Sequence, residues 1–394
     1  MRIGISCLQI NPAYVGGVNT YTLGLLEGFS SIGTDCEFRL YVTAANQHIF
    51  EQFRGRKQFE ITVIDRLSST SRHWICRGTL LSGSATFYEF VSNCIWQTIR
   101  ERIDTEVELL YVPTVILQFF NARTPTVLSM HDIQHAHYPE FFDWRRKLSR
   151  RITYGLSARR ATYLQASSAF IKRDLLEYFP NLLPQRVEVI PEGVNLQEFG
   201  ITNRDSTLSG RYGLPKRYLL CPAQLWPHKN HLTLLTALKK IESEHGCQIP
   251  LALTGASFSA GPQIFEYIAA NQMSYIHYLG KVPIADLIGL YQRATFVVSA
   301  GLYESNSLPI LEAAAAGVPI IASRIPPNEE LGAVLQLNLF DPSDANDLAR
   351  VVLRLWKNQA VASQQVIHNR TSVGCYSWEN TARRYVSLFK RIVN

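Results

Sequence analysis

Two glutamates, Glu304 and Glu312, have the residue type and spacing that most strongly suggest chemistry. They end the stretch Glu-Ser-Asn-Ser-Leu-Pro-Ile-Leu-Glu, which follows an apolar run at Phe296–Ser299 and precedes an alanine-rich run that stops at Gly317. Ser307 suits the N-cap of a helix, the proline suits its first turn, and the glycine suits its end. The pattern therefore predicts a strand, a loop and a helix, with one carboxylate in the loop and the other in the second helical turn.

The predicted strand–loop–helix unit is a candidate site for a nucleotide sugar. Free backbone N–H groups and the macrodipole make a helix N-terminus an anion site, which suits a diphosphate. A carboxylate beside it can accept hydrogen bonds from neutral hydroxyls, which suits a ribose and a sugar. We expect Glu312 to hold the ribose diol and Glu304 the sugar, and we expect the diphosphate to meet the amides of Ser305, Asn306, Ser307 and Leu308. The plainer alternative is a pair of solvated glutamates.

The elements that must position these residues alternate between short apolar strands and helical stretches. Such strands are typical of parallel sheets with helices on both faces, so the fold class is α/β with two doubly wound domains. A chain of 394 residues is long enough for both, and the segment 195–215, rich in glycine, asparagine and serine, is expected to be the boundary loop or linker between them. Ligands of open α/β sheets bind beyond the carboxyl ends of the strands, and the default site is the cleft between two such domains. The predicted strands are 3–7, 38–43, 61–65, 109–112, 126–130, 163–166, 187–190, 218–221, 251–254, 276–279, 296–299 and 319–322.

The spacing Glu-x7-Glu, followed by Ala-x-x-x-Gly-x-Pro, resembles the donor-binding element of retaining glycosyltransferases of family 4. That family has the GT-B fold, in which two Rossmann-like domains face each other across a cleft. The resemblance spans nearly the whole chain, because further motifs follow in the family's order. They are Gly16-Gly17 after the first strand, His131-Asp132, Ile190-Pro-Glu-Gly-Val194, Lys229-Asn230 and Tyr376-Ser-Trp378.

The resemblance implies roles for particular residues. It gives an acceptor-side domain of residues 1–195 with a returning helix at 376–394, and a donor-binding domain of residues 196–375. The expected catalytic residues are His131, Lys229 and Glu304. The expected donor-binding residues are Gly16, Gly17, Gln224, Lys229, Asn230, Glu304, Ser305, Asn306, Ser307, Leu308 and Glu312. No metal is expected, because no Asp-x-Asp follows a strand and 341–344 is typical of a turn.

Departures from the family pattern bear more on which donor is used than on which class of reaction is catalysed. Ala223-Gln224 stands where the family has Gly-Arg, and 305–307 replaces Gly-Phe-Gly. We expect front-face, retaining transfer of a hexose, with UDP-glucose the first choice of donor and GDP-mannose close behind. The expected acceptor is a polysaccharide or a lipid-linked glycan. One alternative is a catalytically weak nucleotide-sugar-binding protein. Another, ranked lower, is an epimerase or phosphorylase with two similar domains.

The net charge of +7 is concentrated in one segment. Residues 145–160 contain seven basic residues and no acidic ones, with Phe141, Phe142 and Trp144 just ahead of them. A solvated helix face and a docking surface for anionic lipids are equally good interpretations, while nucleic acid is the weakest. The basic residues expected to meet a membrane are Arg145, Arg146, Lys147, Arg150 and Arg151.

The sequence also predicts a location. The chain opens on a short strand without the apolar core of a signal peptide, and no apolar run reaches the length of a membrane span. Seven cysteines stand singly, which favours a reducing compartment over disulfides or zinc. We therefore expect a cytoplasmic protein, at the inner face of the membrane if the basic segment docks there.

Overall fold

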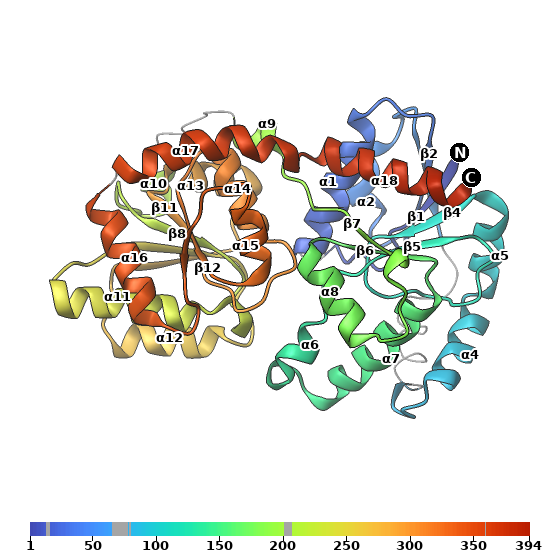
Figure 1. The fold of residues 1–394 in the computed structure, drawn as a ribbon, viewed down its shortest axis with the longest axis horizontal. Coiled ribbons are helices and arrows are strands. Elements are labelled where there is room, and N and C mark those ends of the chain that lie inside the picture. The colour runs from blue at the N-terminus through green and yellow to red at the C-terminus, as the bar shows by residue number, and fades with distance from the viewer. Residues whose placement is uncertain (13–15, 65–77, 79, 201–206, 359) are drawn as a thin grey trace. The chain divides into compact units, whose positions relative to one another are not determined.

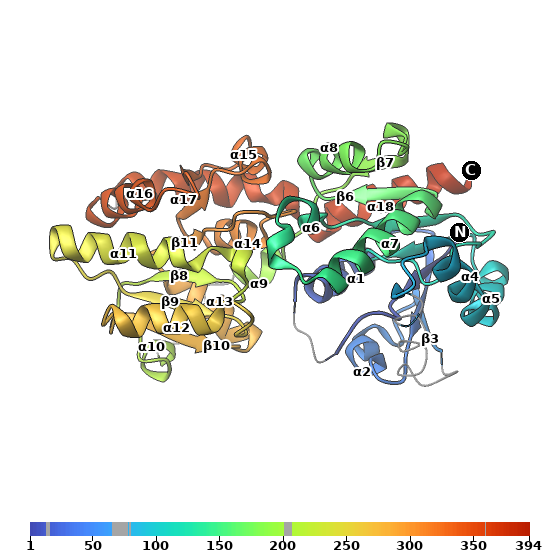
Figure 2. The same ribbon diagram turned by 90° about the horizontal axis from the view of Figure 1, so that it is seen from below.

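The structure is a computed structural model that describes residues 1–12, 16–64, 78, 80–200, 207–358 and 360–394. Unit 1 contains Met1–Gly193 and Trp378–Asn394, and unit 2 contains Val194–Ser377 (Figures 1 and 2). Some residues used above lie outside the described part, namely Asp65 at the end of a predicted strand, Cys76, and 201–206 of the predicted boundary loop.

Unit 1 is built on a seven-stranded parallel sheet with the order β3-β2-β1-β4-β5-β6-β7. Its central strand β4 is apolar throughout, and every residue of β4 and β5 is buried. The strands are β1 (Arg2–Ser6), β2 (Glu37–Val42), β3 (Phe59–Val63), β4 (Leu109–Val112), β5 (Thr126–Ser129), β6 (Tyr163–Ala166) and β7 (Val187–Val189). The helices are α1 (Gly17–Ser31), α2 (Gln47–Phe50), α4 (Ala85–Ile95), α5 (Gln97–Glu106), α6 (Gln134–His137), α7 (Trp144–Arg160), α8 (Ala169–Tyr178) and α18 (Trp378–Val393).

Helix α18 brings the end of the chain back onto unit 1, where it packs beside α1 (Figure 1). Its Tyr385 hydroxyl joins a buried cluster with the hydroxyls of Tyr21, Tyr111 and Ser129, and Tyr111 lies 2.7 Å from Ser129. Two glycines of α1 leave room for Trp378, because a Cβ on Gly24 would overlap its ring and one on Gly28 would overlap its carbonyl group.

Gly28→Ala should therefore destabilise unit 1. The added methyl group meets backbone rather than a movable side chain, and overpacking of this kind costs about 1 to 3 kcal/mol. Gly155→Ala, in the middle of α7, is the matched control because a Cβ there meets nothing within 4 Å. Chemical denaturation should show a lower midpoint for the first variant and an equal or higher one for the second. Equal midpoints for Gly28→Ala and the parent chain would refute the close packing of α18.

Unit 2 is a six-stranded parallel sheet with the order β10-β9-β8-β11-β12-β13. Its strands are β8 (Leu219–Pro222), β9 (Leu251–Thr254), β10 (Ile276–Gly280), β11 (Phe296–Ser299), β12 (Ile320–Ser323) and β13 (Asn338–Phe340). Its helices are α9 (Leu196–Gly200), α10 (Leu208–Arg211), α11 (His231–His245), α12 (Gly261–Ala270), α13 (Ile284–Arg293), α14 (Leu308–Ala316), α15 (Pro326–Gly332), α16 (Ala345–Lys357) and α17 (Ala360–Ser372).

The predicted two-sheet α/β architecture is confirmed, and each predicted strand overlaps an observed one with its ends displaced by at most two residues. Two features differ. Strand β13 was not predicted, because three residues are too few for an apolar run. The segment expected to be a linker contains α9 and α10, whose Phe199 and Leu208 are buried in the core of unit 2. No helix in the described part of the chain is long and apolar enough to cross a membrane.

Candidate active site

The candidate donor site lies in unit 2, beyond the carboxyl ends of β8 and β11. The chain leads from β8 outward to β9 and β10 on one side, and from β11 to β12 and β13 on the other. The neighbouring strands β8 and β11 therefore form the topological switch point, which is where open α/β sheets bind ligands. The two loops that follow them are joined by a hydrogen bond of 2.8 Å from the Leu302 amide to the His228 carbonyl oxygen.

Lys229 and Glu304 meet at this point. Lys229 ends the 3₁₀ turn η4 (Pro227–Lys229), and its Nζ donates to both carboxylate oxygens of Glu304 at 2.8 and 2.9 Å. The side chains are 22% and 11% exposed, so the pair is partly shielded but open to a ligand. The third ammonium proton and the outer lone pairs of the carboxylate remain chemically able to bond. A Cβ on Gly301 would lie 2.5 Å from Glu304 Oε1, so a glycine here leaves room for the carboxylate.

Asn230 and Gln224 hold the loop that carries Lys229. Asn230 adopts a left-handed conformation with φ 58°, and its side chain donates to the Pro342 carbonyl at 2.9 Å and accepts from Thr233 at 2.8 Å. The Gln224 side chain accepts a bond of 3.0 Å from the Trp226 indole. These contacts give both residues a part in positioning Lys229, and their direct contact with the donor stays a prediction.

The loop that carries Glu304 is fixed by a buried polar network. Ser307 Oγ donates to Asn328 Oδ1 at 2.5 Å, and Asn328 donates to the Ser323 carbonyl at 2.9 Å. Ser323 Oγ in turn donates to the Gly301 carbonyl at 2.6 Å, so both ends of the loop are tied to one cluster. Ser307 stands at the N-cap of α14 as predicted, but its side chain makes no capping bond. Its hydroxyl is committed to Asn328 instead.

The start of α14 has one donor that lacks an acceptor. The Asn306 side-chain nitrogen is buried, and no described residue accepts from it. A buried N–H without an acceptor is costly, so this atom is a good candidate for contact with a ligand oxygen. By contrast, the Leu308 amide already donates to the Asn306 carbonyl at 2.9 Å. Of the four backbone amides expected to meet the diphosphate, the Leu308 amide is therefore already hydrogen-bonded within the protein.

Glu312 lies in α14 and accepts a hydrogen bond of 2.5 Å from the hydroxyl of Tyr291, a fully buried residue of α13. Desolvation raises the pKa of Glu312, and the Tyr291 hydroxyl offsets part of that rise. Helical spacing predicted the position of the carboxylate. Tyr291 went unpredicted, because nothing in the sequence links it to a residue in a different helix.

His131 lies in unit 1, directly beyond β5. Its Nε2 is 2.9 Å from the Pro113 carbonyl oxygen, and its Nδ1 is 3.7 Å from Glu192 Oε1. Burial alone would lower the pKa of His131, but the nearby carboxylate of Glu192, with the Pro113 carbonyl, raises it overall. Both ring nitrogens face acceptors, which suits the imidazolium form. Glu192 was quoted above only as part of a motif, and its partnership with His131 was not predicted.

Glu192→Gln should lower the pKa of His131 and destabilise unit 1 most strongly at acid pH. A histidine whose folded-state pKa is raised contributes stability below its unfolded pKa, and that contribution is lost as pH rises through the folded value. We expect a loss of about 1 to 3 kcal/mol at acid pH, as for a buried group that loses its partner. Denaturation of parent and variant at pH 5.5 and 8.5 measures this. A loss that is the same at both pH values would contradict the pairing.

The two glycines predicted to belong to the site, Gly16 and Gly17, lie at the start of α1. Gly16 is the N-cap with an extended backbone, and a Cβ on Gly17 would meet nothing within 4 Å. The described part of the fold therefore does not require glycine at position 17, beside the helix N-terminus. The predicted site residues thus divide between the units, with Gly16, Gly17 and His131 in unit 1 and the others in unit 2.

Comparison with known proteins identifies the family of the chain. Residues 15–198 match the family model described as "Glycosyltransferase Family 4", and residues 216–358 match the one described as "Glycosyl transferases group 1". The chain belongs to this family of glycosyltransferases, and its fold is GT-B.

Relatives and solved structures extend the comparison. The chain is 27% identical to the serotype-specific mannosyltransferase WbdA of Escherichia coli over 59% of its own length and 29% of that protein. It is 28% identical to the O-antigen chain mannosyltransferase B of E. coli over 44% of its length and 45% of that protein. The chain thus spans well under two thirds of these relatives. A crystal structure of Anabaena Alr3699/HepE in complex with UDP and glucose superimposes with a TM-score of 0.73 at 17% identity, covering 99% of this chain and 100% of that one.

Proposed function

We propose that the protein transfers a hexose from a nucleotide sugar to a glycan acceptor. The observation that carries this proposal is the Lys229–Glu304 pair at the switch point of unit 2, beside the start of α14. In this proposal the ammonium neutralises charge on a departing diphosphate, and the carboxylate accepts hydrogen bonds from sugar hydroxyls. Glu312 holds the ribose diol. His131 and Gly17 belong to the acceptor side in this proposal.

The proposed transfer retains the configuration of the sugar and needs no metal. Glu304 is already bonded to Lys229 through both oxygens, which makes it a poor covalent nucleophile. This favours front-face attack through an oxocarbenium-like transition state, in which the leaving phosphate assists the acceptor. Positive charge for the phosphate comes from Lys229 and the helix dipole of α14.

Mannose from GDP-mannose is the first donor to test, because relatives that match by sequence are named mannosyltransferases. UDP-glucose is the second, because a structural relative is described with UDP and glucose. The relatives named for O-antigen chains favour a polysaccharide or lipid-linked glycan as acceptor. The neutral Gln224 also keeps open the alternative of a nucleotide-sugar-binding protein with weak turnover.

The deciding experiment is a donor panel of GDP-mannose, UDP-glucose and ADP-glucose with glycan acceptors, with and without EDTA. We expect one donor to be turned over, at equal rates in both conditions, with the anomeric configuration retained by NMR. Tight binding of a donor without turnover would favour the binding-protein alternative. An isomerised sugar nucleotide would indicate an epimerase.

A further inference from the structure

Unit 1 has a cavity that the proposed reaction does not use. It is open to solvent on one side and has a volume of about 590 Å³ along α7, between the start of α4 and the connection from α8 to β7. These elements lie together in Figure 1. Much of its wall is apolar, with Leu148, Ile152 and Leu156 on α7 and Phe179 and Leu182 opposite. A cavity of this size is in the range that holds a small ligand.

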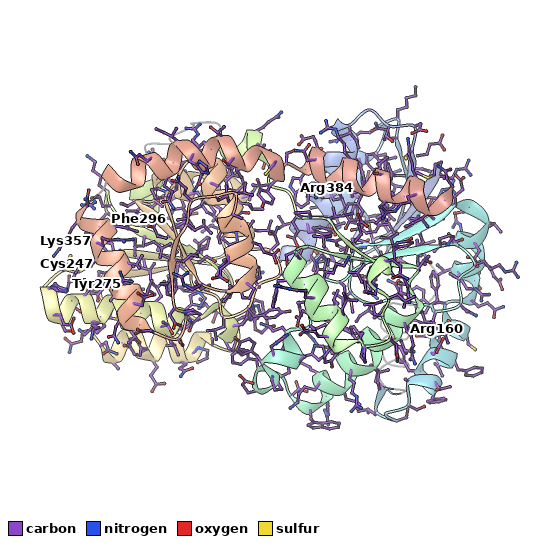
Figure 3. All side chains as sticks on the ribbon, in the orientation of Figure 1. Arg160, Cys247, Tyr275, Phe296, Lys357 and Arg384 are labelled. Atoms are coloured by element: carbon purple, nitrogen blue, oxygen red, sulfur yellow. The ribbon has the colours of Figure 1, made fainter. Side chains whose placement is uncertain are left out.

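The charged residues that line the cavity in the described part of the chain are all positive. Arg151 and Arg159 line it and are exposed, and none of the described lining residues is acidic. Neither arginine has a carboxylate partner in the described part of the chain. The next residue, Arg160, labelled in Figure 3, does pair with Glu89 at 2.7 Å. Within the described ranges, two cations at the cavity are therefore without a compensating carboxylate.

A third lining arginine, Arg186, has a structural task. Its guanidinium donates to the carbonyls of Thr162 at 3.2 Å and Ala158 at 3.3 Å, close to the end of α7. A cation at this position satisfies carbonyls left open at a helix C-terminus. Arg151 and Arg159 are thus the cations available to an anionic ligand.

Exposed apolar side chains lie on the same elements that form the cavity. All the large ones in the described part of unit 1 lie on or beside α4, α7 and the α8–β7 connection, namely Leu81, Phe87, Phe90, Trp144, Tyr178 and Leu183. Phe90 is 65% exposed and Trp144 is 60% exposed. Trp144 shares a face of α7 with Leu148, Arg151 and Gly155, because their spacings of four and three residues follow the helical period. A gathered apolar surface of this kind marks an interaction site.

Gly155 keeps the cavity open. It lies inside α7, where glycine lowers helix stability by about 1 kcal/mol relative to alanine. Among the residues that the structure describes, none lies within 4 Å of a Cβ at this position, and its backbone has no left-handed conformation. Neither packing nor backbone geometry therefore requires glycine here. Because Gly155 lines the cavity and has no side chain, it leaves free volume in the cavity wall.

We propose that this surface binds an anionic phospholipid of a bilayer. The cavity takes apolar chain, Arg151 and Arg159 contact headgroup phosphate, and the exposed aromatic side chains enter the interface. A nucleic acid would engage the arginines but leave the cavity and the exposed apolar side chains without partners. An anionic lipid would contact the arginines through its headgroup and the cavity and exposed apolar side chains through its acyl chains. This inference goes beyond the proposed reaction, because it assigns a second ligand to unit 1 that takes no part in the chemistry.

Flotation of the full chain with phosphatidylcholine vesicles, with and without phosphatidylglycerol, tests the proposal. We expect binding to require the anionic lipid. The double variant Arg151→Glu/Arg159→Glu should weaken it at least about tenfold, since each basic residue near an anionic surface contributes about fivefold. Arg383→Glu/Arg384→Glu changes the net charge equally on α18, where Arg384 is well apart from Arg160 in Figure 3, and should bind as the parent does.

A filling variant tests the cavity itself. Gly155→Leu should fold at least as well as the parent, because leucine favours helix and has space, yet it should bind the anionic vesicles several-fold more weakly. Gly155→Ala should stay close to the parent, and thermal unfolding of each variant checks the fold. Unchanged binding by a folded Gly155→Leu would overturn the lipid cavity. Equal binding to neutral and anionic vesicles, no binding to either, or equal losses in the two double variants would overturn the docking surface.

Discussion

Lys229→Ala should lower kcat about 10²- to 10³-fold, with a much smaller change in KM. One preorganised donor at a developing oxyanion contributes roughly 3 to 4 kcal/mol to the barrier. Here Lys229 is the cation beside the start of α14, and Gln224 supplies no second charge. Charge on a leaving diphosphate grows only as the sugar bond breaks, so the loss falls mainly on turnover.

The same variant changes the electrostatics of Glu304. Its carboxylate, 11% exposed, loses an ammonium partner that contacts both oxygens. Lys229→Arg should recover part of the activity, because the charge returns in a bulkier, planar group. Lys216→Ala, at an exposed position of the same unit, is the matched control and should be silent. The assignment of Lys229 is wrong if Lys229→Ala keeps its turnover within about threefold of the parent, since removal of a preorganised donor costs far more.

Glu312→Gln should raise the KM for the donor about 10- to 100-fold, since a hydrogen bond to a charged acceptor contributes roughly 1.5 to 3 kcal/mol. The fold should tolerate the change. Burial already disfavours the Glu312 carboxylate, and glutamine keeps an oxygen to accept from Tyr291. Steady-state kinetics measures the effect. The control is Glu266→Gln, which changes an exposed glutamate of α12. A parental KM in the Glu312 variant would remove this residue from the donor site.

The raised pKa of Glu312 also predicts a pH dependence. As pH falls through that raised value, the carboxylate takes up a proton and its capacity to accept from a diol weakens, so the KM for the donor rises. The Tyr291 hydroxyl lowers this pKa in part, so Tyr291→Phe should move the acid limb to higher pH. An acid limb that does not move, in a variant that remains folded, would contradict the link between Tyr291 and donor binding.

The parts of this protein that the sequence predicts well are those with local signals. The strand before Glu304, the helix start at Ser307 and the helix end at Gly317 all follow from neighbouring residues, and so does α18. The same local pattern placed Glu312 in the second turn of a helix. Family resemblance added Lys229, which no local signal separates from a surface lysine.

The parts that sequence analysis missed are partnerships between distant residues. Ser307 bonds to Asn328, Glu312 to Tyr291, and His131 lies near Glu192, and none of these pairs is a local neighbour in the chain. Each depends on how helices and loops meet in the folded unit, which composition and periodicity do not encode. The lipid cavity is a similar case, because the sequence showed the basic run of α7 but not the role of Gly155.

The central claim is that Glu312, Lys229 and Glu304 form a nucleotide-sugar site. Calorimetric titration of the parent chain and of Glu312→Ala with GDP and with UDP tests it most directly. We predict saturable one-to-one binding of one of these diphosphates to the parent, weakened at least about tenfold in the variant, as expected for loss of a charge-assisted hydrogen bond. Failure of the parent to bind either nucleotide, or equal affinity in a folded variant, would contradict it.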